Sequence, residues 1–173
     1  AALVQPTGFR RIHIKTSSVG KEMILRNGIT SFFLHRDIPE FHFAEFAEII
    51  STVIDPMGFT FGETTERGIT PNFHTIRVKL LRDEIMVIGH SNFPIIAFAD
   101  PFELWRMTIP FRDADRIATR IVELYPQVLI ATQEELSTRI ERAHLEMLNR
   151  IELDQVKYWK PQTIGELVFN WWD

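Results

Sequence analysis

Six histidines are the side chains best suited to acid–base or metal chemistry in this chain of 173 residues, which contains no cysteine. No two of them have the H-x-x-x-H or H-E-x-x-H spacing that places two imidazoles on one helical face for zinc. Without cysteine the chain also has no thiolate ligand and no cysteine nucleophile. We therefore expect neither a bound metal nor a cofactor.

His74 and His90 are the two histidines that the sequence could bring together. His74 precedes an alternating run that is typical of a strand, and His90 follows the apolar run Ile85–Ile88. Antiparallel pairing of residues 76–81 with 84–89 would place both imidazoles at the same end of a hairpin. There they could serve as acid and base, or as metal ligands, together with a nearby carboxylate. The carboxylates selected for this role are Glu63, Glu66 and Asp100.

The short motifs that mark a nucleophile or a phosphate site are missing from the sequence. It has no G-x-S-x-G elbow, no P-loop and no G-x-G-x-x-G after a strand. A small hydrolase or metal-dependent enzyme using His74 and His90 is therefore kept as an alternative, and the main hypothesis is non-catalytic.

The C-terminal segment, residues 153–173, becomes more aromatic toward its end, where it holds Trp159, Phe169, Trp171 and Trp172. One interpretation is a closing element that covers the sheet or a helix, because terminal segments order only when they are tied down. The other is a partner-binding surface, since tryptophan is enriched among the residues that dominate interface energies. Neighbouring side chains diverge in a helix and in a strand. We therefore expect one of the last two indoles against the body of the protein and the other exposed.

Strands that could position these residues are indicated by alternating or unbroken apolar runs. Four such runs predict an antiparallel meander within residues 74–110, and they lie at 76–80, 85–88, 95–99 and 105–109. Asn27-Gly28 between two apolar runs predicts a hairpin over residues 23–34, because a type I′ turn needs positive φ. Phe9–Lys15 predicts a short edge strand, and residues 62–72 predict a surface loop.

Helices are indicated by apolar stripes and by one capping box. Residues 41–54 have a broad apolar stripe, and Thr132 with Glu135 matches the S/T-x-x-E pattern of a helix start. We expect the helix that begins there to run to about Glu152. The predicted fold is α+β, an antiparallel sheet made of the hairpin and the four-strand meander, with helices packed mainly on one face. One core cluster is expected to contain Phe46, Ile50, Val78, Leu80, Val87, Ile96, Phe98, Ile109, Ile121 and Ile140.

Composition places the chain among ordinary globular proteins. Its 45% hydrophobic and 24% charged residues argue against disorder, and we expect a single domain over 1–173 with a loose terminus at 1–8. The net charge of −4 argues against nucleic-acid binding, and no apolar run is long enough to span a membrane. The first residues lack the features of an intact signal peptide, and the chain lacks an initiator methionine, so we expect a trimmed, processed or fragment chain. The absence of cysteine favours a reducing cytoplasm.

Three functions follow as hypotheses. The first is a non-catalytic cytosolic protein-binding or regulatory module, such as a small inhibitor, immunity-type or accessory protein that acts through its surface. The second is the histidine-based enzyme. The third is a structural subunit of an oligomer that uses the aromatic tail. In each binding hypothesis a protein partner or self-association is expected.

Overall fold

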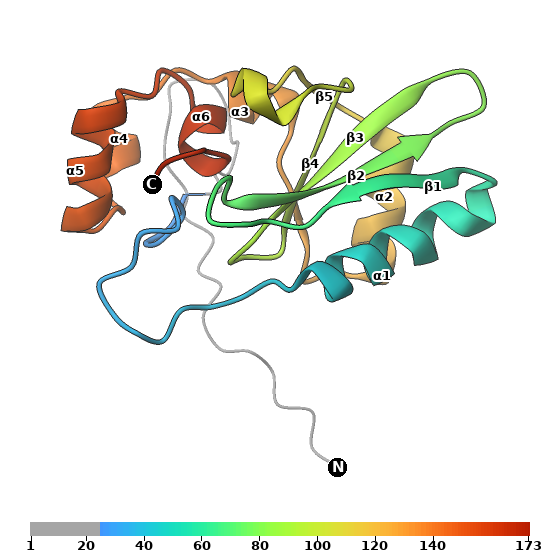
Figure 1. Ribbon diagram of the computed structural model, residues 1–173, viewed down its shortest axis with the longest axis horizontal. Coiled ribbons are helices and arrows are strands. Elements are labelled where there is room, and N and C mark those ends of the chain that lie inside the picture. Colours follow the sequence, from blue (N-terminus) through green and yellow to red (C-terminus); the bar gives the residue numbers. More distant parts are fainter. Residues whose placement is uncertain (1–24) are drawn as a thin grey trace, which may run out of the picture.

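A six-stranded sheet forms the centre of the computed structural model, which describes residues 25–173 (Figure 1). Its strands are β1 Thr60–Thr65, β2 Phe73–Lys79, β3 Glu84–His90, β4 Ile95–Ala99, β5 Phe111–Arg112 and β6 Leu129–Ile130. Strands β1 to β5 are antiparallel neighbours in that order, and β6 pairs in parallel with β4. The predicted α+β fold with a mainly antiparallel sheet is confirmed. The predicted terminus at 1–8 and strand at Phe9–Lys15 lie outside the described residues.

Alternation along the central strands divides the apolar side chains between two faces of the sheet, as expected for a period of two. In β3, for example, Ile85 and Val87 face one cluster of buried residues, whereas Met86 and Ile88 face the other. The apolar run of β3 is buried, as is every residue of this strand after Glu84.

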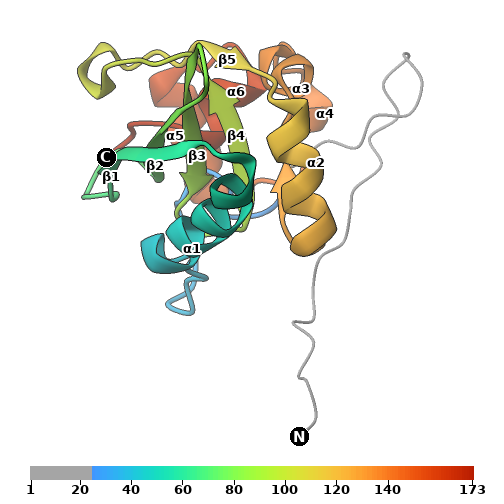
Figure 2. The same ribbon diagram turned by 90° about the vertical axis from the view of Figure 1, so that its right-hand side faces the viewer.

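Helices cover both faces rather than mainly one. They are α1 Phe43–Ile54, α2 Asp115–Leu124, α3 Gln133–Ser137, α4 Arg142–Leu145, α5 Arg150–Trp159 and α6 Ile164–Val168, with 3₁₀ helices η1 at Asp55–Met57 and η2 at Leu104–Arg106. Buried residues of α1 and α2 join one cluster, and those of α3 and α6 join the other. Figures 1 and 2 show α1 and α2 near each other, with α4, α5 and α6 gathered away from them. None of the helices within residues 25–173 is long and apolar enough to cross a membrane.

Most of the predicted core residues are buried, but the ten residues do not form the single cluster that was predicted. Seven of the ten residues are buried together against α1 and α2, and Leu80 packs at the edge of that cluster. Ile109 and Ile140 are only partly buried and pack against the other cluster. The chain therefore needs two apolar layers, one on each face of the sheet.

Two predicted strands are absent from residues 25–173, and β1 extends to Thr65, into the segment 62–72 that was expected to be a surface loop. The described part of the 23–34 hairpin, from Leu25 onward, contains no strand, although Gly28 does adopt the positive φ of 83° that its turn requires. The fourth strand of the meander is replaced by η2 and by Met107 at a φ of 53°, so pairing with β4 begins only at Phe111.

The helix that was expected to run to Glu152 is interrupted twice. Its capping box is confirmed, because the Thr132 hydroxyl accepts from the Glu135 backbone and the Glu135 carboxylate accepts from the Thr132 backbone. The chain then leaves helical geometry to form a bridge between Arg139 and Thr163, and Asn149 begins α5 as a new N-cap.

An extended segment, residues 25–41, crosses the end of the sheet before α1, and we call it the strap. Its polar backbone is held mainly by buried side chains from other elements instead of by a strand partner. Carbonyl oxygens of the strap at Ile29, Thr30, Phe32, Pro39 and Phe41 accept hydrogen bonds from His90, Asn170, Asn149, Asn92 and His74 respectively. These side chains thus make the hydrogen bonds to the strap backbone that a paired strand of a hairpin would have made.

Glu152 is the most connected of these anchors, and its side chain is fully buried. Its two carboxylate oxygens accept five hydrogen bonds, from the backbone of Gly28, from the backbone and hydroxyl of Thr30, and from the backbone and side chain of Asn149. The donor–acceptor distances lie between 2.8 and 3.0 Å. A buried carboxylate is tolerated only when hydrogen bonds replace its lost hydration, and these bonds do so.

Replacing Ile50 with alanine should lower the free energy of unfolding by about 2–5 kcal/mol, because Ile50 is fully buried between α1 and the sheet. Urea unfolding followed by circular dichroism measures the change. Leu81→Ala is the matched control, since 88% of Leu81 is exposed. An unchanged midpoint for Ile50→Ala would contradict the assignment of α1 to this layer.

Replacing Glu152 with glutamine should also destabilise the protein. An amide keeps the shape of the side chain, but its NH₂ group would face the N–H donors that now bind Glu152 Oε1 or Oε2. Each buried donor left without an acceptor costs about 1–3 kcal/mol. Denaturant unfolding of Glu152→Gln beside Glu123→Gln, which changes an exposed carboxylate, gives the comparison. Equal stability of the two variants would show that the five bonds contribute little.

Candidate functional site

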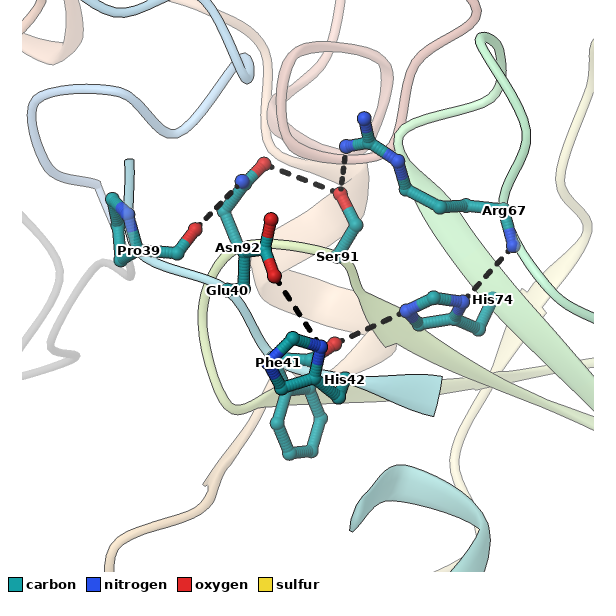
Figure 3. Close-up of polar contacts among 8 residues, drawn as sticks. All are labelled: Pro39, Glu40, Phe41, His42, Arg67, His74, Ser91 and Asn92. Carbon is teal, nitrogen blue, oxygen red and sulfur yellow. Dashed lines mark hydrogen bonds and ion pairs between the residues drawn. The ribbon is translucent and has the colours of Figure 1, made fainter. Parts of the chain in front are cut away.

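His74 lies on the α1 side of the sheet, in a small polar cleft shown in Figure 3. Its Nδ1 accepts from the backbone N–H of Arg67 at 3.0 Å, so the ring proton is on Nε2, which donates to the Phe41 carbonyl at 3.1 Å. The ring stacks on Phe46, with 6.1 Å between centroids. Burial lowers the pKa of His74, and the bond to Phe41 opposes this only in part. Both ring nitrogens of His74 therefore form hydrogen bonds with backbone groups of the protein itself.

His90 has the same tautomer in a drier setting. Its Nε2–H donates to the Ile29 carbonyl at 2.8 Å, and its Nδ1 accepts from the backbone of Asn92 and Phe93 at 3.0 and 3.3 Å. Burial lowers the pKa of His90 to about 3, despite the opposing effect of the bond to Ile29. The imidazole is neutral at physiological pH and its nitrogens are occupied, so it is poorly suited to proton transfer.

The two histidines lie at the same end of the β2–β3 hairpin but on opposite faces of the sheet. His74 pairs with Gly89, and His90 pairs with Phe73, so successive residues send the two rings in opposite directions. A Cβ at Gly89 would lie 2.8 Å from the Phe46 ring, which explains the glycine beside His74. The structure therefore does not bring the two imidazoles into one pocket.

The three carboxylates proposed as helpers are also dispersed. Glu63 lies 3.8 Å from Arg77, and Asp100 lies 3.0 Å from Arg112, so both take part in ion pairs on the surface. Only Glu66 lines the same cleft as His74, along with exposed Glu40 and His42. Within residues 25–173 no group of three or more His, Asp or Glu side chains could hold a metal ion.

Polar contacts in the cleft hold the strap to the sheet (Figure 3). Arg67 donates from its guanidinium to the Ser91 hydroxyl at 2.9 Å, and Ser91 donates to Asn92 at 3.2 Å. Asn92 in turn donates to the Pro39 carbonyl at 2.8 Å. The cleft, of about 270 Å³, is thus crossed by bonds that join the strap to the sheet, and we do not select it as the functional site.

A larger cavity, of about 420 Å³, is a groove beside the C-terminal tail, and we call it the aromatic groove. Its walls come from the loop after η2, from α3, from the end of α5, and from α6 with the residues that follow. Side chains that line it include Met107, Ile109, Phe111, Leu136, Trp159, Pro161, Glu166, Phe169, Trp171 and Trp172. All four tail residues that sequence reasoning selected for partner binding therefore lie around one groove.

The tail that forms the floor of the groove is fixed by packing and by two asparagines. Phe169 is buried, and the Phe73 ring contacts both Phe169 and Trp171 edge-to-face, at 6.0 and 5.1 Å. Asn170 donates to the Thr30 and Leu167 carbonyls, and its own N–H donates to the Asn72 side chain at 2.8 Å. The groove is therefore formed before any ligand arrives.

Trp171 and Trp172 do not divide into one packed and one exposed indole, as had been expected. Both are partly buried, both pack against the core, and both line the groove. The expectation assumed helix or strand geometry, but residues 170–173 form neither, and Asn170 turns the chain by accepting from the Trp172 N–H at 3.1 Å.

Sequence reasoning missed two parts of this surface, Met107 and α6, and it also missed the exposure of Trp105, which lines a separate cavity. Trp105 is 74% exposed and Met107 is 52% exposed, because the segment read as a strand is a 3₁₀ helix followed by a loop. Helix α6 was missed too, although Thr163 and Glu166 repeat the spacing of a capping box, and Thr163 does accept from the Glu166 N–H. The structure explains the glycine at position 165 in α6, because a Cβ there would lie 2.5 Å from the Phe111 ring.

Comparisons with protein-family models, with curated proteins and with solved structures found no match to this chain.

Stability should fall as the pH is lowered from 6.5 toward 3, because His90 stays neutral in the folded protein while the unfolded chain gains a proton at its ordinary pKa of 6.5. Above pH 6.5 His90 does not lower the stability. Between pH 6.5 and 3, each pH unit lowers the free energy of unfolding by about 1.4 kcal/mol through this one group. The lowered pKa of His74 acts in the same direction. Urea unfolding at a series of pH values measures the slope.

The variant His90→Gln should be less stable at pH 7 and should show a smaller loss of stability on acidification. His42→Gln is the control, since His42 is exposed. If His90→Gln kept the full slope of the parent protein, the acid sensitivity would have to come from other groups.

Proposed function

We propose that the protein is a non-catalytic protein-binding module, of the small inhibitor, immunity or accessory type, and that the aromatic groove is its binding surface. The observation that carries this proposal is a preformed groove of about 420 Å³ bordered by three partly exposed indoles, Trp159, Trp171 and Trp172. Tryptophan combines a large contact area with a small loss of side-chain freedom, which is why it is enriched among binding hot spots.

Exposed apolar side chains beside the groove extend this surface. Met107 lies just after η2, is 52% exposed and lines the groove. Tyr158, which is 76% exposed, contacts the Trp159 ring edge-to-face at 5.2 Å. Aromatic residues and methionine are the types enriched in the buried centre of protein–protein interfaces. This composition favours a protein as the ligand of the groove.

The enzyme alternative receives less support from the same geometry. His74 and His90 lie on opposite faces of the sheet, and each uses both ring nitrogens to hold backbone groups. The cytoplasmic location belongs to the proposal as well and rests on the absence of cysteine. Self-association through the groove is the second binding alternative, and it is separated from a foreign partner by the experiment below.

Met107→Ala should weaken binding of the partner at least tenfold without changing stability, because Met107 lines the groove, is exposed and packs on no buried cluster. Proteins captured from cells that natively make this chain would be identified, purified and titrated against it by calorimetry. Trp172→Ala should have a similar effect, and Leu81→Ala should have none, since Leu81 lies far away on the β2–β3 turn.

The proposal fails if the purified partner binds the Met107 and Trp172 variants as tightly as it binds the parent protein. Sedimentation of the purified chain alone tests the oligomer alternative. A concentration-dependent dimer that is lost in Trp172→Ala would show that the groove receives a second copy of the chain.

A further inference from the structure

The charge of the aromatic groove is set by one residue. Among the described residues that line it, Glu166 is the only one with an ionisable acidic or basic side chain. No lysine, arginine or histidine of residues 25–173 reaches the lining, although five aromatic rings do, from Phe111, Trp159, Phe169, Trp171 and Trp172. The groove is therefore lined by aromatic, aliphatic and uncharged polar side chains, with a single negative charge.

Glu166 is positioned by the start of α6 rather than by a basic partner. Its Oε2 accepts from the Gln162 N–H at 2.6 Å, and its own N–H donates to the Thr163 hydroxyl. Within residues 25–173 its carboxylate forms no ion pair, and the residue is exposed. The negative charge is thus fixed in place and available to a ligand.

The chemistry of these groups favours a cation. The faces of aromatic rings carry partial negative charge and attract ammonium and guanidinium groups. An anion would be repelled by Glu166, and a neutral apolar group would cover part of this carboxylate without replacing its hydration. The part of the chain that supplies the lining, residues 83–173, is acidic overall, with 15 Asp and Glu against nine Lys and Arg, and this balance acts in the same direction.

We infer that the aromatic groove receives an arginine side chain of the partner protein, with the guanidinium stacked on the indoles and paired with Glu166. Arginine fits better than lysine because its guanidinium is planar, is weakly hydrated and forms two parallel bonds with a carboxylate. This inference rests on the proposed function, since it names the residue that the protein-binding groove would recognise.

Titration with small amides tests the inference without knowledge of the partner. The probes are N-acetyl-arginine amide, its neutral isostere N-acetyl-citrulline amide, and N-acetyl-norleucine amide. Binding is followed by tryptophan fluorescence and by the indole N–H signals in ¹⁵N spectra of the full chain. We expect the arginine amide to bind at least tenfold more tightly than the citrulline amide.

Glu166→Gln should reduce this preference for arginine to less than threefold while leaving the weak binding of the norleucine amide unchanged. Glutamine keeps an oxygen that can accept from Gln162, so the start of α6 is preserved. Glu48→Gln is the control, because Glu48 is exposed on α1, which covers the opposite face of the sheet. This variant should keep the full preference for the arginine amide. In the parent protein the preference should also shrink as salt is raised, which does not depend on any variant.

Equal binding of the arginine and citrulline amides would overturn the inference, as would an unchanged preference in Glu166→Gln. No response of the indole signals to any of the amides would overturn it too. Each of these results leaves the protein-binding proposal standing if Met107→Ala and Trp172→Ala still weaken binding of the purified partner, so the two failures are distinguishable.

Discussion

The buried carboxylate of Glu152 is the interaction on which the arrangement around the sheet end depends. It lies at the start of α5 and gathers donors from Asn149 on its own helix and from Gly28 and Thr30 in the strap. Hydrogen bonds to a charged acceptor are stronger than those between neutral groups, but the charge is tolerated only while all of them are made. The carboxylate therefore specifies one position of the strap relative to α5.

This anchor reaches the aromatic groove through the strap. Thr30 donates to Glu152, and its own carbonyl accepts from Asn170, which also fixes the tail that forms the floor of the groove. Asn72, just before β2, holds the tail from the other side by donating to the Val168 carbonyl at 3.0 Å. The groove is thus supported by buried polar contacts between segments that are far apart in the sequence, and a preformed site loses less entropy on binding.

Sequence reasoning succeeded where the signal was local and failed where a distant group decided the structure. Alternation at Ile76 and Val78 was sufficient to predict β2. The hairpin predicted from Asn27-Gly28 is wrong because this turn is held by Glu152, which lies more than a hundred residues away in the sequence. The separation of His74 and His90 was readable in principle. A hairpin loop with an even number of residues pairs positions of unlike parity on one face, so two positions of like parity, such as 74 and 90, lie on opposite faces. The groove was not readable, because its walls come from four separate elements.

Convergence of the strap on side chains of the sheet and of α5 has a consequence for local opening. A surface segment without helix or strand normally exchanges its amide hydrogens through small local fluctuations. Here release of the strap would leave the buried Glu152 carboxylate with only its two bonds to Asn149, because the other three come from Gly28 and Thr30. We therefore expect opening of the strap to be coupled to fraying of the start of α5, and these amides to exchange as one cooperative unit. By secondary structure the strap is a loop, but by its dynamics it belongs with the core.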